Sequence, residues 1–122
     1  MYKRTLSILL LAASGTAFSA NVTGDVERGK RIHTGEEAIE GLAACHTCHG
    51  QDANQTLGAT FPRLAGQYAD YLVYALESYK NGTRNNAVMY PIASKLSERD
   101  MRDLAVFYES LSGDLDDLSH LR

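Results

Sequence analysis

The chain has 122 residues, 44% of them hydrophobic, and a formal net charge of −3 at pH 7. Its length allows one small domain. The negative charge makes it a poor binder of nucleic acid, whose phosphates attract basic side chains. After residue 20, no hydrophobic segment has the roughly 20 apolar residues that a membrane-spanning helix needs.

Residues 1–20 have the pattern of an export signal. Two basic residues precede an apolar run at 6–13, which is too short for a membrane anchor. Small residues then allow cleavage after Ser19 or Ala20. The sequence therefore predicts a periplasmic protein whose signal peptide is cleaved near residue 19 or 20.

Cleavage would leave one mature domain of residues 21–122. This part keeps ten basic and fifteen acidic side chains, a net charge of −5. We expect a folded core at about 25–111 and an acidic tail at 112–122. A partner of such a protein would present a basic or neutral docking face.

Helical signals dominate the mature part, and the alternation typical of strands is absent from it. Asp25 can cap a first helix, which the pair Thr34 and Gly35 ends. Asn81 and Gly82 have the pattern of a helix end. The predicted helices cover residues 26–33, about 68–80, 91–96 and 98–112.

The two longest predicted helices carry apolar residues at spacings of three and four, which form one helix face. In the last helix, Ser97 and Asp100 resemble a capping box with Asp where Glu is usual. The predicted core positions are Tyr68, Tyr71, Leu72, Ala75, Leu76 and Tyr79 in the middle helix, and Met101, Leu104, Ala105, Tyr108 and Leu111 in the last.

Cys45, Cys48 and His49 form the most informative motif. Two cysteines three positions apart, followed directly by a histidine, are typical of the attachment of a c-type haem. Each thiol can add to one vinyl group of the porphyrin, and His49 is then held beside the ring as an axial ligand of the iron. In bacteria this attachment takes place outside the cytoplasm, which agrees with export. The motif predicts one covalent haem c.

Three other interpretations of the motif stay open at this point. A structural zinc site needs four ligands, so His33 or His120 would have to join the motif. A thioredoxin-like redox pair needs a βαβ context, for which no strand pattern exists here. A disulfide between Cys45 and Cys48 would leave His49 unexplained.

The group on the second face of the iron decides the function, because a tight ligand favours electron transfer and an open site favours gas binding or peroxidase chemistry. Met1 is lost with the signal, and Met101 fits the apolar face of the last helix. Met89, in a predicted loop at 83–90, is therefore the candidate, 40 residues after His49. Its rivals are His33, His120 and Lys95.

These features resemble the class I cytochromes c in their short bacterial periplasmic form with one haem. The similar segments are residues 62–67 at the entry to the middle helix, 81–84 with Met89 in the methionine loop, and 96–105 in the C-terminal helix. The resemblance covers roughly residues 25–111. It implies an all-α fold, the class I cytochrome c fold, in which four to five helices wrap around one covalent haem.

The resemblance also implies roles for single residues. Cys45 and Cys48 would carry the haem thioethers. The carbonyl of Pro62 would accept the Nδ1 proton of His49 and so set its orientation. Arg84 would pair with a haem propionate.

In the family fold the first and last helices cross near a small residue. Here this residue would be Gly29, packed against Leu104 and Phe107. Residues 34–41 have the length of an insertion before the haem motif, and they are the candidate for a permanent contact with another protein.

The functional interpretation that we favour is a carrier of single electrons between a redox donor and acceptor, such as a membrane-bound oxidase or a periplasmic dehydrogenase. The alternative is an electron-relay subunit of a larger dehydrogenase or oxidase complex. A peroxidase or gas sensor would require an open position in place of Met89. We therefore expect no enzyme activity, small-molecule substrate or nucleic acid, and either a monomer or a complex subunit.

Overall fold

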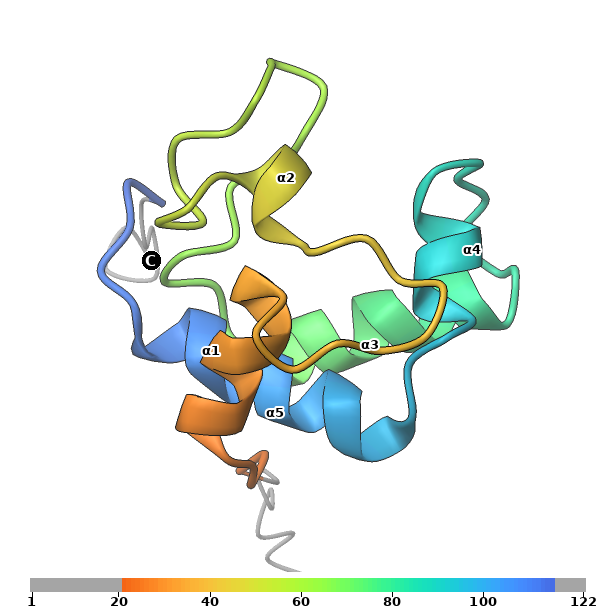
Figure 1. Cartoon of the computed structure of the whole chain (residues 1–122), viewed down its shortest axis with the longest axis horizontal. Coiled ribbons are helices and arrows are strands. Elements are labelled where there is room, and N and C mark those ends of the chain that lie inside the picture. Colours follow the sequence, from red (N-terminus) through yellow and green to blue (C-terminus); the bar gives the residue numbers. More distant parts are fainter. Residues whose placement is uncertain (1–20, 116–122) are drawn as a thin grey trace, which may run out of the picture.

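The computed structural model describes residues 21–115 (Figure 1). This part of the chain contains helices and no β-strand, so the predicted all-α class is confirmed. It also holds no helix that is long and apolar enough to cross a membrane. The predicted export signal, His120 and the tail from residue 116 onward lie outside the described residues. The helices are α1 (Val26–Thr34), α2 (His46–His49), α3 (Ala69–Lys80), α4 (Met89–Ala93) and α5 (Glu98–Ser110).

Helix α1 lies across α5, and the two backbones touch at Gly29 (Figure 1). A Cβ atom at Gly29 would collide with the backbone carbonyl of Asp103 and would lie 2.8 Å from the Cβ of Phe107. Only glycine allows so close an approach. The predicted crossing at Gly29 is confirmed, with the Asp103 backbone as the nearest part of α5.

A charged network joins the two crossing helices. Arg28 of α1 donates to Asp100 Oδ1 at 2.6 Å and to Asp103 Oδ2 at 2.7 Å, both in α5. It also donates to Glu37 Oε1 at 2.6 Å. Glu37 lies within residues 34–41, so this segment is attached to the crossing of α1 and α5 by an ion pair.

Helix α3 packs against α5 through a face that includes Leu72 and Ala75. The predicted core positions Tyr68 and Tyr71 are wrong, since these residues are 55% and 43% exposed. The apolar face of this helix is wider than the contact with α5, and the buried side runs through Ala69 and Leu72. Tyr71 lies on the exposed side of α3, and Tyr68 lies just before the helix begins.

Helix α4 begins at Met89, two residues before the predicted helix at 91–96. The side-chain oxygen of Asn86 accepts hydrogen bonds from the backbone N–H groups of Val88 at 2.9 Å and Met89 at 2.8 Å. These bonds satisfy donors that a helix start leaves unpaired. Pro91 then lies in the first turn, where its missing N–H costs nothing. Met89 is therefore at a helix start and not in a loop.

Helix α5 starts with the predicted capping box between Ser97 and Asp100, which is confirmed. It ends at Ser110, two residues before the predicted end at residue 112. Met101 is 1% exposed, so its predicted role in core packing is confirmed. The most deeply buried large side chains are Ile32, His33, Leu96, Met101 and Leu104.

Candidate haem site

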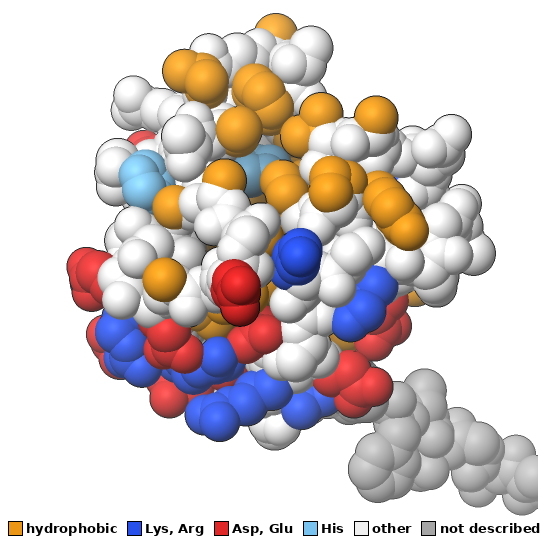
Figure 2. Space-filling view, turned by 45° about the vertical axis from the view of Figure 1, so that its right-hand side comes forward, with side chains coloured by type: hydrophobic (Ala, Val, Ile, Leu, Met, Phe, Trp, Pro, Cys, Tyr) orange, Lys and Arg blue, Asp and Glu red, His pale blue; other side chains and the backbone are white. Residues whose placement is uncertain are grey.

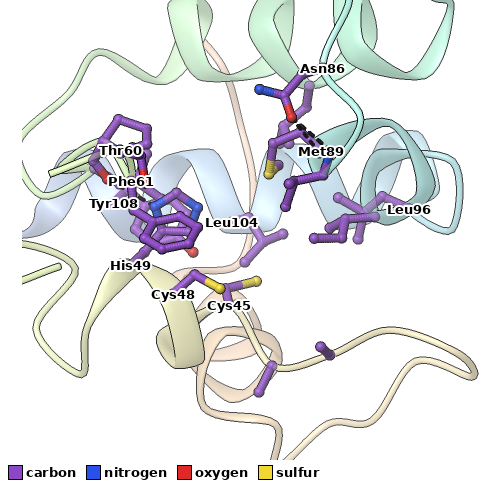
Figure 3. A pocket seen from close by; sticks show the side chains of 17 residues that line it. Cys45, Cys48, His49, Thr60, Phe61, Asn86, Met89, Leu96, Leu104 and Tyr108 are labelled. Atoms are coloured by element: carbon purple, nitrogen blue, oxygen red, sulfur yellow. Dashed lines mark hydrogen bonds between the residues drawn. The ribbon is translucent and has the colours of Figure 1, made fainter. Parts of the chain in front are cut away.

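A cavity of about 280 Å³ lies between α2 and α4 (Figure 3). Cys45, Cys48 and His49 lie on one side of it, and Met89 lies on the other. Leu104 of α5 lies between these two sides, and most of the other lining side chains are apolar. The fold thus brings the four residues of the predicted site around one apolar space.

The carbonyl group of Pro62 fixes the orientation of the His49 ring. The residue is 8% exposed, and its Nδ1 lies 2.8 Å from the carbonyl oxygen of Pro62. A carbonyl oxygen only accepts, so Nδ1 carries the proton and Nε2 keeps a free lone pair. Burial lowers the pKa of His49, while the bond to Pro62 opposes this change. The ring is therefore neutral at neutral pH, which is the form that binds a metal ion.

The two cysteines are half-buried free thiols at the single turn of α2. Burial raises the pKa of Cys45, and the side chain of Tyr108 opposes this rise. The interpretation as a disulfide between Cys45 and Cys48 is wrong for this structure. The thioredoxin-like interpretation lacks its βαβ context, because the described residues form no strand.

The zinc interpretation also finds no support within residues 21–115, where no three His, Cys, Asp or Glu side chains are arranged to hold a metal ion. Both ring nitrogens of His33 have other partners, Tyr108 Oη at 3.0 Å and the carbonyl of Gln51 at 3.2 Å. His33 and the exposed Lys95, two rival iron ligands, do not line the cavity.

Met89 reaches the cavity because of the turn that precedes it. The Asn86 cap starts α4 at this residue, and the Met89 sulfur points into the space that faces His49 (Figure 3). Met101 is in the core and does not line the cavity. Of the two methionines in the described part, Met89 is the one at the site.

Arg84 is not among the residues that line the cavity. Its guanidinium group lies 4.8 Å from the centre of the Tyr79 ring, and its Nη1 donates to Tyr71 Oη at 3.3 Å. The contact between Arg84 and a haem propionate stays a prediction.

Two residues at or near the site were not predicted to act there. Phe61 lies edge-on to the His49 ring at 6.4 Å, and Tyr108 lines the cavity from α5. Tyr108 was predicted only as a core position. Its partner His33 lies four residues after Gly29, on the side of α1 that faces α5, so helical spacing could have indicated its burial.

Charged and apolar side chains occupy different parts of the surface. Figure 2 shows hydrophobic side chains gathered in the upper part of one face, with a histidine among them, and acidic and basic side chains gathered in the lower part. The lower part corresponds to the region of α1 and α5 in Figure 1. The region around the haem motif is thus the less charged one in this view.

The profile of the family described as "Cytochrome c" matches residues 26–112. The chain belongs to the cytochrome c family. Among its curated relatives, the "Thiosulfate dehydrogenase electron acceptor" of Stutzerimonas stutzeri (strain A1501) is 41% identical over 83 residues, which are 68% of this chain and 38% of the relative. Cytochrome c-554(548) of Halomonas halodenitrificans is 40% identical over 72 residues, which are 57% of this chain and 86% of the relative.

Solved structures show the same fold. Cytochrome c4 of Acidithiobacillus ferrooxidans has a TM-score of 0.66 at 37% identity, over 70% of this chain and 49% of that one. Thiosulfate dehydrogenase (TsdBA) of Marichromatium purpuratum has a TM-score of 0.67 at 29% identity, over 77% of this chain and 20% of that one. This chain spans about two fifths of the length of the first curated relatives that it matches. The class I cytochrome c fold is confirmed.

As a cytochrome c, the chain has haem c as its covalent cofactor. The side chains at the cavity fit this group. Two free thiols lie beside an apolar space, together with a neutral imidazole and a thioether sulfur on opposite sides. Soft sulfur and imidazole nitrogen are the ligands that haem iron takes in electron-transfer proteins.

Proposed function

We propose that the protein carries single electrons between redox proteins and is not an enzyme. Its haem c would be joined to Cys45 and Cys48, with His49 and Met89 as the iron ligands. The observation that carries this proposal is the placement of the His49 ring and the Met89 sulfur on opposite sides of one apolar cavity (Figure 3). The haem supplies the one-electron chemistry by cycling between Fe(III) and Fe(II).

Two further residues that line the cavity, Pro62 and Asn86, support the proposed ligands. The Pro62 carbonyl holds the orientation of the His49 ring, and the Asn86 cap holds the backbone at Met89. Ligands held in this way keep nearly one geometry in both oxidation states, which suits fast electron transfer. A methionine ligand also raises the reduction potential. The mostly apolar walls of the cavity favour an apolar ring over water.

Met89→Ala tests the second ligand. We expect a lower reduction potential and rapid binding of added cyanide or imidazole by the oxidised protein, because the alanine leaves one iron position open. Met101→Leu is the matched control, since this methionine is in the core, and it should leave both properties unchanged. If Met89→Ala binds these ligands no faster than the wild type, Met89 is not a ligand.

Optical spectra of the purified oxidised and reduced protein test whether a c-type haem is bound with a methionine ligand. We expect the reduced bands of a c-type haem and, in the oxidised protein, the weak near-infrared absorption of iron bound to methionine sulfur. A wild-type protein that takes up cyanide as fast as an open-site haem would contradict the carrier function.

We further propose that the protein works in the periplasm. Support comes from the export pattern of residues 1–20 and from the need to attach haem c outside the cytoplasm. N-terminal sequencing of periplasmic protein should find Ala20 or Asn21 as the first residue. Intact residues 1–20 on a haem-loaded protein would contradict the predicted cleavage.

A second candidate function is that of an electron-relay subunit in a larger complex. Two observations favour it: curated relatives are named as electron acceptors of thiosulfate dehydrogenase, and a solved thiosulfate dehydrogenase contains the same fold within a chain of which this protein covers 20%. Gel filtration of the native material separates the two functions. A free monomer supports the carrier, and co-elution with a dehydrogenase supports the subunit.

We propose a dehydrogenase of reduced sulfur compounds as the class of electron donor, again because of these relatives. Mixing the oxidised protein with such a dehydrogenase and thiosulfate should reduce its haem. The docking should be weak and fast, with an interface of less than about 1,200 Å². No reduction beyond the rate without dehydrogenase would contradict this donor.

A further inference from the structure

His33 is a buried histidine behind the haem motif. It is 0% exposed and does not line the cavity. Its ring lies 5.4 Å from the rings of both Phe107 and Tyr108 in α5. A phenylalanine could pack among these rings without any need for polar partners, whereas a buried imidazole is costly unless both nitrogens are satisfied. The polar groups of His33 therefore require an explanation beyond packing.

The hydrogen bonds of His33 determine where its proton is. Nε2 lies 3.2 Å from the carbonyl of Gln51, which can only accept, so Nε2 carries the proton. Burial lowers the pKa of His33, so the ring is neutral at neutral pH and has no second proton. Nδ1 is then a bare acceptor, 3.0 Å from Tyr108 Oη. Tyr108 must donate its hydroxyl proton to His33.

The hydroxyl group of Tyr108 also lies near the side chain of Cys45. Tyr108 and Cys45 both line the cavity, and burial together with the nearby Cys45 side chain raises the pKa of Tyr108 well above its ordinary value. The hydroxyl group has one proton and two neighbours that can accept it. An imidazole nitrogen is a strong acceptor and a thioether sulfur a weak one, so the proton goes to His33. The oxygen of Tyr108 then turns its lone pairs toward the Cys45 sulfur.

We propose that His33 is a positioning residue that sets the reduction potential by drawing the Tyr108 hydroxyl proton away from the Cys45 thioether. This inference rests on the proposed attachment of haem at Cys45. The negative end of the hydroxyl dipole then faces the sulfur that joins the haem. In a buried site of low dielectric constant such a dipole acts strongly. It stabilises the more positive, oxidised state and lowers the potential.

His33→Phe is the direct test. Phenylalanine keeps an aromatic ring in place but offers no acceptor, so the Tyr108 hydroxyl turns and donates to the Cys45 sulfur. At a fixed applied potential near the midpoint, the ratio of reduced to oxidised protein should rise by about three- to tenfold, and the tenfold limit equals 59 mV for a one-electron couple. An unchanged or lowered ratio overturns the inference.

Tyr108→Phe and the double variant separate positioning from packing. Removal of the hydroxyl group should itself raise the ratio, because a negative dipole end is lost. His33→Phe should then have no further effect in the Tyr108→Phe background. Shifts of the two single variants that add in the double variant overturn the inference, because independent effects add. If His33→Phe does not fold, the absence of a shift in Tyr108→Phe alone overturns it.

Phe107→Leu is the matched packing control. Phe107 touches the same His33 ring but has no polar atom, and it does not line the cavity. Its substitution should leave the potential unchanged, and a shift as large as that of His33→Phe would overturn the inference. The near-infrared band of the methionine ligand, recorded on the wild type, keeps the two proposals apart. With that band present and the potentials of all variants equal, only the role of His33 fails.

Discussion

The crossing of α1 with α5 and the cavity between α2 and α4 are built on different principles. At the crossing, Gly29 brings two backbones into contact, and Arg28 joins α1 to the carboxylates of α5. At the cavity, the side chains that face one another leave an apolar space of about 280 Å³ between them. The chain completes the crossing with its own groups, whereas the cavity needs the haem to complete it.

This difference predicts where stability comes from. An unfilled apolar space loses the dispersion contacts that a packed interior makes. The crossing of α1 and α5 contains no such unfilled space, and its charged groups are already paired with one another. The two regions should therefore respond differently to loss of haem and to substitutions, and loss of haem should have the largest effect on stability.

Loss of haem should have the largest effect. We expect the haem-free chain, made as the double variant Cys45→Ala with Cys48→Ala, to be largely unfolded, because binding free energy of the haem stabilises the native state alone. Far-ultraviolet circular dichroism measures this. A haem-free chain with the helix signal of the holoprotein would show that the α1 and α5 crossing suffices to hold the whole fold.

Gly29→Ala should have the next largest effect. The added methyl group would collide with the Asp103 carbonyl, so the two helices must move apart, at a cost of about 3 kcal/mol in the free energy of unfolding. Denaturant titration of the holoprotein measures this change. Gly58→Ala is the matched control, since a Cβ there meets no atom within 4 Å. Equal stability of the two variants would contradict the close crossing.

Arg28→Met should cause the next largest loss in the free energy of unfolding. The substitution removes the cation of Asp100 and leaves Asp103 only its 3.5 Å pair with the exposed Arg99, while the side chains of the two aspartates are only 9% and 4% exposed. Because Arg28 itself is 16% exposed and water can enter, we expect a loss of about 2 kcal/mol, below the range for fully buried pairs. Arg102→Met is the control, since it removes only the exposed pair with Glu98 at 3.7 Å. A loss as small as in the control would mean that the network adds no stability.

Acid should produce the smallest of these effects. Burial opposes the ionisation of Asp100, but hydrogen bonds from Ser97 and Arg28 outweigh it and hold its pKa below the ordinary value of 3.8. A lowered pKa means that this stabilisation is complete above about pH 4, the unfolded value, and is lost as the pH falls through the folded pKa. Urea midpoints between pH 5 and pH 3 should therefore fall less steeply in Asp100→Asn than in the wild type. If the urea midpoints of both proteins fall equally steeply with pH, groups other than Asp100 cause the loss of stability in acid.

The sequence predicted the parts of the fold that depend on neighbouring residues. The Ser97 capping box and the end of the first helix at Gly35 are both local patterns. Their hydrogen bonds and backbone angles involve residues a few positions apart. The close crossing at Gly29 was predicted because the family resemblance supplied its distant partner.

The predictions that failed depended on the width of a tertiary contact or on a local cap that competed with another helix-start signal. Tyr68 and Tyr71 have the spacing of a core face, but the width of the α3 contact with α5 leaves them exposed. The start of α4 at Met89 depends on the Asn86 side chain, which competes with the later start that Pro91 suggests. Periodicity identifies the apolar face of a helix, but it does not show how much of that face a partner covers.

By itself, the sequence determined the chemistry of this protein, because two thiols and an imidazole have the spacing of haem attachment. It also determined where several helices begin and end, because capping residues lie next to these ends in the sequence. Tertiary structure alone decided that Tyr68 and Tyr71 are exposed, that Glu37 pairs with Arg28, and that the hydroxyl group of Tyr108 reaches Nδ1 of His33. The physical reason is the distance along the chain over which each interaction acts. Covalent spacing and capping act within one turn of the chain, whereas burial and hydrogen-bond competition depend on residues that only folding brings together.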